Sequence, residues 1–78
     1  MEKSKVYFTD MRVDYTHNML VKLKKLLEKS NMKKINFEGK FVALKVHFGE
    51  YGNLAFIRPN YIKVVADYVK ELGGIPFV

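Results

Sequence analysis

Lys45 and His47 are the residues whose types and spacing are best suited to chemistry. They occupy alternate positions near the end of the run FVALKVHFGE, which begins at Phe41. This run starts as an almost continuous apolar stretch, a pattern typical of a strand buried on both faces. Burying a charge without a partner is costly, so the Lys45 ammonium and the His47 imidazole are expected to be paired with another group, exposed to solvent or used in binding or catalysis. We therefore interpret His47 and Lys45 as candidate catalytic residues, with His47 suited to acid–base work.

Other polar residues are expected at the same edge of the fold, because ligands of open parallel sheets bind at the carboxyl ends of the strands. One loop follows the apolar run 6–9, another follows the run 41–48, and a third position lies just before a helix whose N-terminus presents free N–H groups. The candidate ligand-binding residues in these places are Asp10, Arg12, Glu50, Asn53 and Arg58. This set suits a small anionic ligand.

A structural interpretation stands beside each of these functional ones. Lys45 can extend its charge into solvent while its stem packs, and His47 can be a hydrogen-bonded core residue. Asp10 can cap a loop, and Arg58 can pair with Asp10 or Glu50.

The elements that must position these residues alternate between strand and helix. Val6–Thr9 reads as a short strand, and apolar residues at helical spacing follow from Met19 to Leu27. Thr16 or Asn18 can cap that helix. The central strand runs from 41 to 48, a second helix starts near Pro59, and a last strand follows Gly73-Gly74. The order β-α-β-α-β predicts an α/β fold with a parallel sheet connected by right-handed crossovers.

Two helices on three strands cover one face of such a sheet well and the other poorly, although parallel sheets need both faces covered. We therefore expect residues 1–78 to be a single N-terminal α/β domain or domain fragment, an incomplete piece of a larger α/β domain. The partner that completes it is expected to be the remainder of the parent domain or a second copy of the chain in a dimer.

The formal net charge of +6 is compatible with an anionic partner such as nucleic acid. However, the chain has only two arginines, the usual residues for bidentate phosphate or base contacts. A solvated helix face is therefore the preferred interpretation of the basic residues. A nucleic-acid-binding module is one alternative function, and a self-associating structural fragment is the other. Much of the excess lies on and after the first helix, at Lys22, Lys24, Lys25, Lys29, Lys33 and Lys34.

Several classes of site and location are disfavoured by composition. The sequence has no cysteine, which excludes disulfides, thiolate catalysis and iron–sulfur ligation by these residues. His17 and His47 lack a fixed third ligand, so no metal site is predicted. No apolar run approaches the ~20 residues of a membrane span, and the N-terminus lacks a signal-peptide pattern. We expect a cytoplasmic protein without a membrane partner.

The chain also resembles a known family. Five segments are similar to the opening of uncharacterised iron–sulfur-centre proteins that carry the domain of unknown function 362. These segments are VYFTDMR from Val6, VALKVHFGE from Val42, GN at Gly52, IRP from Ile57 and GGIPF from Gly73. The resemblance spans nearly the whole chain but only the N-terminal part of that family.

This resemblance implies a parent protein with a redox or electron-transfer role. Many longer family members end in a ferredoxin-like segment that binds 4Fe-4S clusters, for which the present residues supply no ligand. The resemblance assigns no catalytic residue, so whether the chain is part of an enzyme stays open.

Overall fold

The structure, a computed structural model, describes residues 3–78. It contains two α-helices, α1 (Met19–Lys29) and α2 (Pro59–Glu71), a short 3-10 helix η1 (Asn31–Lys34), and two strands, β1 (Phe41–Ala43) and β2 (Ile75–Phe77). The strands pair in parallel, with Phe41 opposite Ile75 and Ala43 opposite Phe77. The predicted α/β class with parallel pairing, in a small incomplete unit, is therefore confirmed.

At each end of helix α1 a polar residue hydrogen-bonds to the main chain of the terminal turn. Asn18 is the N-cap, and its side-chain oxygen accepts a 2.9 Å hydrogen bond from the Val21 N–H. At the other end the Ser30 N–H donates to the carbonyls of Leu26 and Leu27. The Ser30 hydroxyl then accepts from the Met32 N–H and starts η1. Of the two predicted caps, the structure uses Asn18.

Helix α2 starts at Pro59, whose fixed φ suits the first turn, and it stops at glycine. Gly73 has a φ of +91°, and the Gly74 N–H returns to the Val69 carbonyl at 2.9 Å. A Cβ atom on Gly74 would lie 2.7 Å from Val69 Cγ1 and 3.1 Å from Val42 Cγ2. The chain therefore needs glycine here because the end of α2 and strand β1 approach each other closely.

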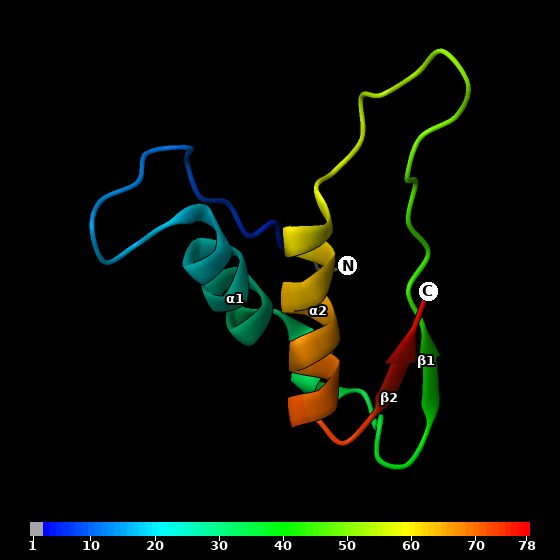
Figure 1. Cartoon of the computed structure of the whole chain (residues 1–78). Helices are drawn as coiled ribbons and strands as arrows, with labels where there is room; N and C mark the ends of the chain where they lie inside the picture. The colour runs from blue at the N-terminus through cyan, green and yellow to red at the C-terminus, as the bar shows by residue number, and fades with distance from the viewer. Residues whose placement is uncertain (1–2) are drawn as a thin grey trace.

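The elements form three layers in which α2 lies between α1 and the sheet (Figure 1). Along the strand and its extended continuation, Val42, Leu44 and Val46 are partly buried on the side of α2, whereas the alternate residues are exposed. One face of the sheet is thus covered and the other is open, as the sequence predicted. We call the open face the outer face; its residues are Phe41, Ala43, Lys45, His47, Ile75 and Phe77.

Two predicted strand segments are shorter or missing. Val6–Thr9 forms no strand, and Val6 and Phe8 are 87% and 84% exposed. The central strand ends at Ala43 instead of Phe48. A strand needs a neighbour for its backbone groups, and β2 reaches only far enough for Leu44 N–H to donate to the Phe77 carbonyl. Within residues 3–78, the amides of residues 45–49 have no hydrogen-bond acceptor. The predictions of a strand at Val6–Thr9 and of a central strand reaching Phe48 were therefore wrong.

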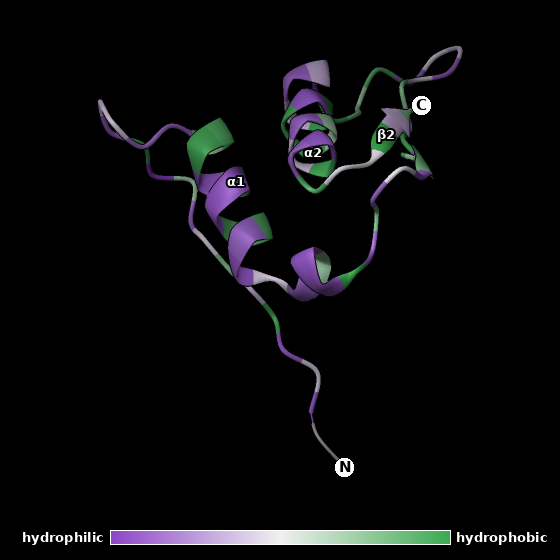
Figure 2. Cartoon of the chain, turned by 90° about the horizontal axis from the view of Figure 1, so that it is seen from below, coloured by the Kyte–Doolittle hydropathy of each residue, from purple (hydrophilic) through white to green (hydrophobic). Residues whose placement is uncertain are grey.

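The hydrophobic core is small. Among the described residues only the hydrophobic side chains of Tyr68 and Val69 on α2 are buried. Figure 2 shows hydrophobic residues on both α-helices as well as on β2 and the chain beside it. The total exposed surface is 6893 Å², whereas a folded monomer of 9.1 kDa is expected to expose about 4,900 Å². The radius of gyration, 14.4 Å, likewise exceeds the roughly 11.5 Å of a compact domain of this length.

None of the helices within residues 3–78 has the length and apolar character needed to cross a membrane.

Candidate functional site

Asp10 lies at the centre of a small network of cations. Lys22 Nζ on α1 is 2.7 Å from Asp10 Oδ1 and 3.0 Å from the Asp10 carbonyl oxygen, and it also donates to the Arg12 carbonyl. Arg12 Nε donates to Asp10 Oδ2 at 3.0 Å. The hydrogen bonds from Lys22 and then Arg12 lower the pKa of Asp10. Lys22 therefore fastens the loop of residues 10–12 to α1, although we expected this lysine on a solvated helix face.

Asp14 closes the next part of the same loop. Its Oδ1 accepts hydrogen bonds from the Thr16 N–H at 2.8 Å, the His17 N–H at 2.8 Å and the Thr16 hydroxyl at 3.0 Å. These donors, the two backbone groups first, lower the pKa of Asp14 to about 2. The His17 ring stands beside it, with Nδ1 3.4 Å from Asp14 Oδ1. Asp14 thus has a structural role in shaping the loop before α1.

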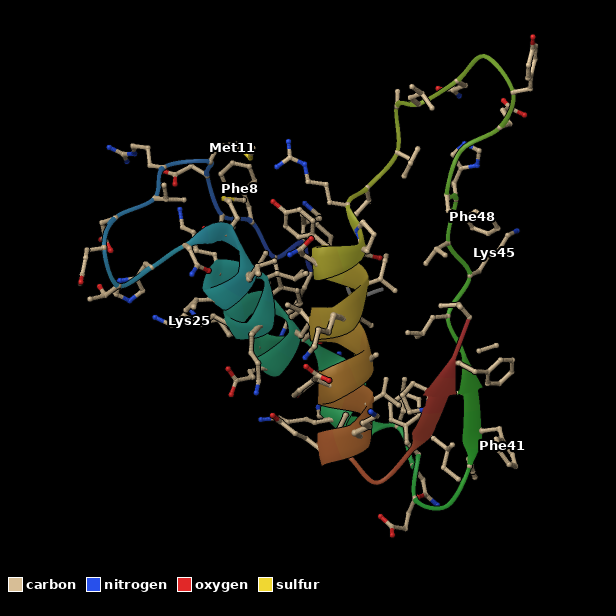
Figure 3. The ribbon with its side chains drawn as sticks, viewed as in Figure 1. Phe8, Met11, Lys25, Phe41, Lys45 and Phe48 are labelled. Carbon is tan, nitrogen blue, oxygen red and sulfur yellow. The ribbon has the colours of Figure 1, made fainter. Side chains whose placement is uncertain are left out.

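The loop and α1 together enclose a groove of about 560 Å³. We call it the cationic groove; its charged and titratable lining residues are Asp10, Arg12, Asp14, His17, Lys22, Lys25 and Lys29. The three lysines are spaced i, i+3 and i+7, so they form one stripe along α1. Lys25 and Lys29 form no ion pair within residues 3–78, and Figure 3 shows Lys25 projecting from α1 on the side away from α2. Four cations against two carboxylates leave the groove positive.

Lys45 and His47 lie elsewhere. Both are exposed on the outer face, and α2 separates the sheet from α1 and the cationic groove (Figures 1 and 3). Neither forms an ion pair with another residue of the described part of the chain. His47 also borders a mostly apolar groove of about 450 Å³ between the continuation of β1 and α2. Within residues 3–78, the Lys45 ammonium and the His47 imidazole are therefore both without a charged partner.

Glu50 and Asn53 form a tight turn beyond the sheet. The Asn53 N–H donates to the Glu50 carbonyl at 2.9 Å, and the Glu50 N–H donates to the Asn53 carbonyl at 3.2 Å. Gly49 and Gly52 have φ of +98° and +83°, which permits this turn. The Asn53 side chain accepts from the Ala55 N–H at 2.9 Å. Both predicted ligand residues are thus held in a defined local geometry.

Arg58 is the N-terminal flanking residue of α2, and its side chain makes no capping hydrogen bond. It borders a second apolar groove together with Met11 and Tyr61, so it lies near the loop that carries Asp10 and Arg12. The structure therefore brings Arg58 towards Asp10 and Arg12. It places Lys45 and His47 on the outer face, and Glu50 and Asn53 in the turn beyond it.

The groove lysines that the sequence did not assign to the site are Lys22, Lys25 and Lys29, and Asp14 and His17 of the same groove were not among the predicted site residues either. Their signal is the spacing of the three lysines on one helix face directly after the loop of Asp10 and Asp14. No group of three or more histidine, aspartate or glutamate side chains is arranged to hold a metal ion among residues 3–78. An iron–sulfur cluster also finds no thiolate in this sequence.

No protein-family model matches the chain, and no curated protein or solved structure shows significant similarity to it.

Proposed function

We propose that this chain is the N-terminal α/β unit of a cytoplasmic iron–sulfur-centre protein with a redox or electron-transfer role, and that it binds a small anionic molecule in the cationic groove. The parent protein is inferred from the resemblance of the sequence. The ligand class is inferred from one observation: Lys25 and Lys29 line the groove beside Arg12 and Lys22, and within residues 3–78 neither pairs with a carboxylate. Unpaired ammonium groups on adjacent helical turns suit a phosphate or carboxylate ligand.

In this proposal some groups of the groove hold the loop and others bind the ligand. Lys22 is held by Asp10 and keeps the loop in place, whereas Lys25 and Lys29 are free to meet the ligand. Asp10 and Asp14 add negative charge to the same groove. These carboxylates repel a long phosphate backbone more than a compact anion that contacts only the lysines, which favours a small molecule over nucleic acid.

The proposed ligand site is tested by calorimetry with inorganic pyrophosphate as the probe anion. Lys25→Gln/Lys29→Gln is expected to weaken binding at least about tenfold, because two charge-assisted contacts are lost. Lys33→Gln/Lys40→Gln is the matched control, since it removes the same charge from exposed positions outside the groove, and it should bind like the wild type. Equal losses in both double variants would show a nonspecific charge effect and overturn the site.

A single-stranded oligonucleotide serves as the second titrant. Tight binding that weakens steeply with salt, with no response to pyrophosphate, would replace the small-ligand proposal by the nucleic-acid-binding alternative.

The assignment to an iron–sulfur-centre protein has a separate test. The nucleotide sequence of the gene past the codon for Val78 is expected to continue the reading frame into a segment with clustered cysteines. A stop codon directly after Val78 would contradict this part of the proposal and leave the ligand site unaffected. Lys45 and His47 stay proposed acid–base groups, and Glu50 and Asn53 proposed ligand contacts, at a site of the assembled protein that is separate from the cationic groove. Arg58, which lies near the loop of Asp10 and Arg12, also stays a proposed ligand contact.

A further inference from the structure

The strand residues of the outer face form an apolar surface that no other segment of residues 3–78 covers. The register places Phe41 opposite Ile75 and Ala43 opposite Phe77, so the four side chains form one patch. Phe41 is 76% exposed and Phe77 is 51% exposed. In Figure 3 Phe41 and Lys45 project from this face away from α2. Parallel sheets bury both faces, and exposed patches of this kind mark interaction surfaces.

A second exposed apolar feature lies directly beyond this face. Residues 48–58, which we call the arm, extend past the end of β1 and turn back to the start of α2 (Figure 1). Phe48, Leu54 and Ile57 on the arm are 79%, 85% and 64% exposed. The paired hydrogen bonds between Glu50 and Asn53 fix its turn. The arm thus offers exposed apolar side chains on either side of a turn whose backbone is hydrogen-bonded.

We propose that a second copy of the chain covers the outer face with its arm, and that the contact is reciprocal about a two-fold axis. The arm continues the direction of β1, so it lies beyond its own outer face and does not cover it. Two copies in antiparallel orientation place each arm over the outer face of the other. A two-fold axis makes both contacts equivalent and closes the assembly.

Charge favours this arrangement over direct packing of two outer faces. Lys45 extends the outer face and Glu50 lies in the turn of the arm, and neither forms an ion pair within the described chain. Arm-on-face packing brings these opposite charges together, whereas face-on-face packing sets Lys45 against apolar side chains or another lysine. The dimer would also bring Lys45 and His47 of one copy to Glu50 and Asn53 of the other. These predicted site residues would then form one site, composed across the interface.

The exposed area fits such a dimer. Each chain exposes 6893 Å², about 2,000 Å² more than a compact monomer of its mass. Obligate dimers bury on the order of 2,000–5,000 Å² in total, or about 1,000–2,500 Å² from each chain. A second copy is therefore large enough to account for the excess.

Sedimentation equilibrium of the 78-residue chain tests the proposal with two charge variants. The wild type is expected to be a dimer. Phe41→Lys on the outer face and Leu54→Glu on the arm should each weaken association on the order of tenfold or more. An equimolar mixture of the two variants should restore the dimer. In the mixed dimer, one contact sets the Glu arm of the Leu54→Glu chain on the Lys face of the Phe41→Lys chain, and the other contact joins a wild-type arm to a wild-type face. Tyr51→Lys changes a fully exposed aromatic at the tip of the turn and is the control that should stay dimeric.

Covalent capture gives a readout that does not depend on these variants. Since the chain has no cysteine, mixed Ala43→Cys and Leu54→Cys chains should form the mixed disulfide under oxidant faster than Ala43→Cys pairs with itself. A wild-type monomer at high concentration would overturn the proposal, and would fit a cover supplied by another part of the parent protein. Arm-on-face packing would be overturned if Phe41→Lys lost the dimer while Leu54→Glu kept it. It would also be overturned if two Ala43→Cys chains formed a disulfide faster than the mixed Ala43→Cys and Leu54→Cys pair.

Discussion

The ammonium of Lys22 lies 2.7 Å from a carboxylate oxygen of Asp10 and 3.0 Å from the main-chain carbonyl of the same residue. One side chain of α1 therefore holds both the side chain and the backbone of the preceding loop. The Lys22 side chain is only 16% exposed, whereas the Arg12 side chain that also contacts Asp10 is 91% exposed. The contact from Lys22 is therefore the less screened of the two, and we expect it to contribute more to holding the loop.

Lys22→Met should release this loop while leaving α1 folded. The variant keeps most of the apolar stem and removes the three hydrogen bonds of the ammonium, so amide exchange of residues 10–16 should become faster. Hydrogen exchange measured by NMR checks this, with Lys25→Met as the control because Lys25 makes no ion pair within residues 3–78. Unchanged exchange in the loop would show that Lys22 does not hold it.

The carboxyl of Asp14 should make the fold sensitive to acid. Its pKa is lowered from 3.8 to about 2 by the N–H groups of Thr16 and His17 and by the Thr16 hydroxyl. A carboxyl with a lower pKa in the folded state stabilises the fold above its unfolded pKa, and that contribution is lost as the pH falls from 3.8 to about 2. The pKa of Asp10 is shifted in the same direction. The free energy of unfolding should therefore decrease across this interval.

An NMR titration of the Asp14 carboxyl carbon measures this effect directly. The wild type should titrate with a midpoint near 2, and Thr16→Val should raise it modestly because the backbone donors are kept. A wild-type midpoint at the ordinary value of 3.8 would contradict the hydrogen-bonding account.

Val69→Ala should be among the most destabilising single changes. Val69 is 0% exposed, and its Cγ1 lies close to Gly74, where the chain passes from α2 towards β2, so its removal leaves a cavity in the core. We expect a loss of about 2 kcal/mol in the free energy of unfolding, measured by urea denaturation. Val6→Ala removes the same atoms from a side chain that is 87% exposed, so it should change stability little. Similar losses in the two variants would mean that the small core is not where we place it.

Gly49→Ala should disturb the arm more than Gly52→Ala does. Both glycines have positive φ, so either substitution strains the backbone by roughly 1 kcal/mol. At Gly49 the new Cβ would also lie 2.9 Å from Phe56 Cε1, whereas at Gly52 it would meet no atom within 4 Å. The Phe56 ring should therefore move only in Gly49→Ala, and its NMR chemical shifts report this. Equal ring shifts in the two variants would show that Phe56 does not pack on Gly49.

The helices were predictable because their signals are local, and the parallel pairing followed from the strand–helix–strand order, which requires a crossover connection. Apolar spacing, the Asn18 cap, Pro59 and Gly73-Gly74 each specify a boundary within a few residues. The strands were overestimated because a strand also depends on a neighbour, and Val6–Thr9 finds none in this structure. The site was predicted as one edge because parallel strands were assumed to end together. With the first strand missing, Asp10 packs on α1 through Lys22, and Lys45 stays on the sheet.

The most direct test of the proposed function is a titration of the ¹⁵N-labelled chain with inorganic pyrophosphate, followed by two-dimensional NMR. Saturable shifts are expected at residues 10–17 and along the lysine face of α1 at Lys22, Lys25 and Lys29. Residues 45–53 should not respond, because α2 lies between them and the cationic groove. Shifts confined to residues 45–53, or no saturable shift, would contradict binding in the cationic groove.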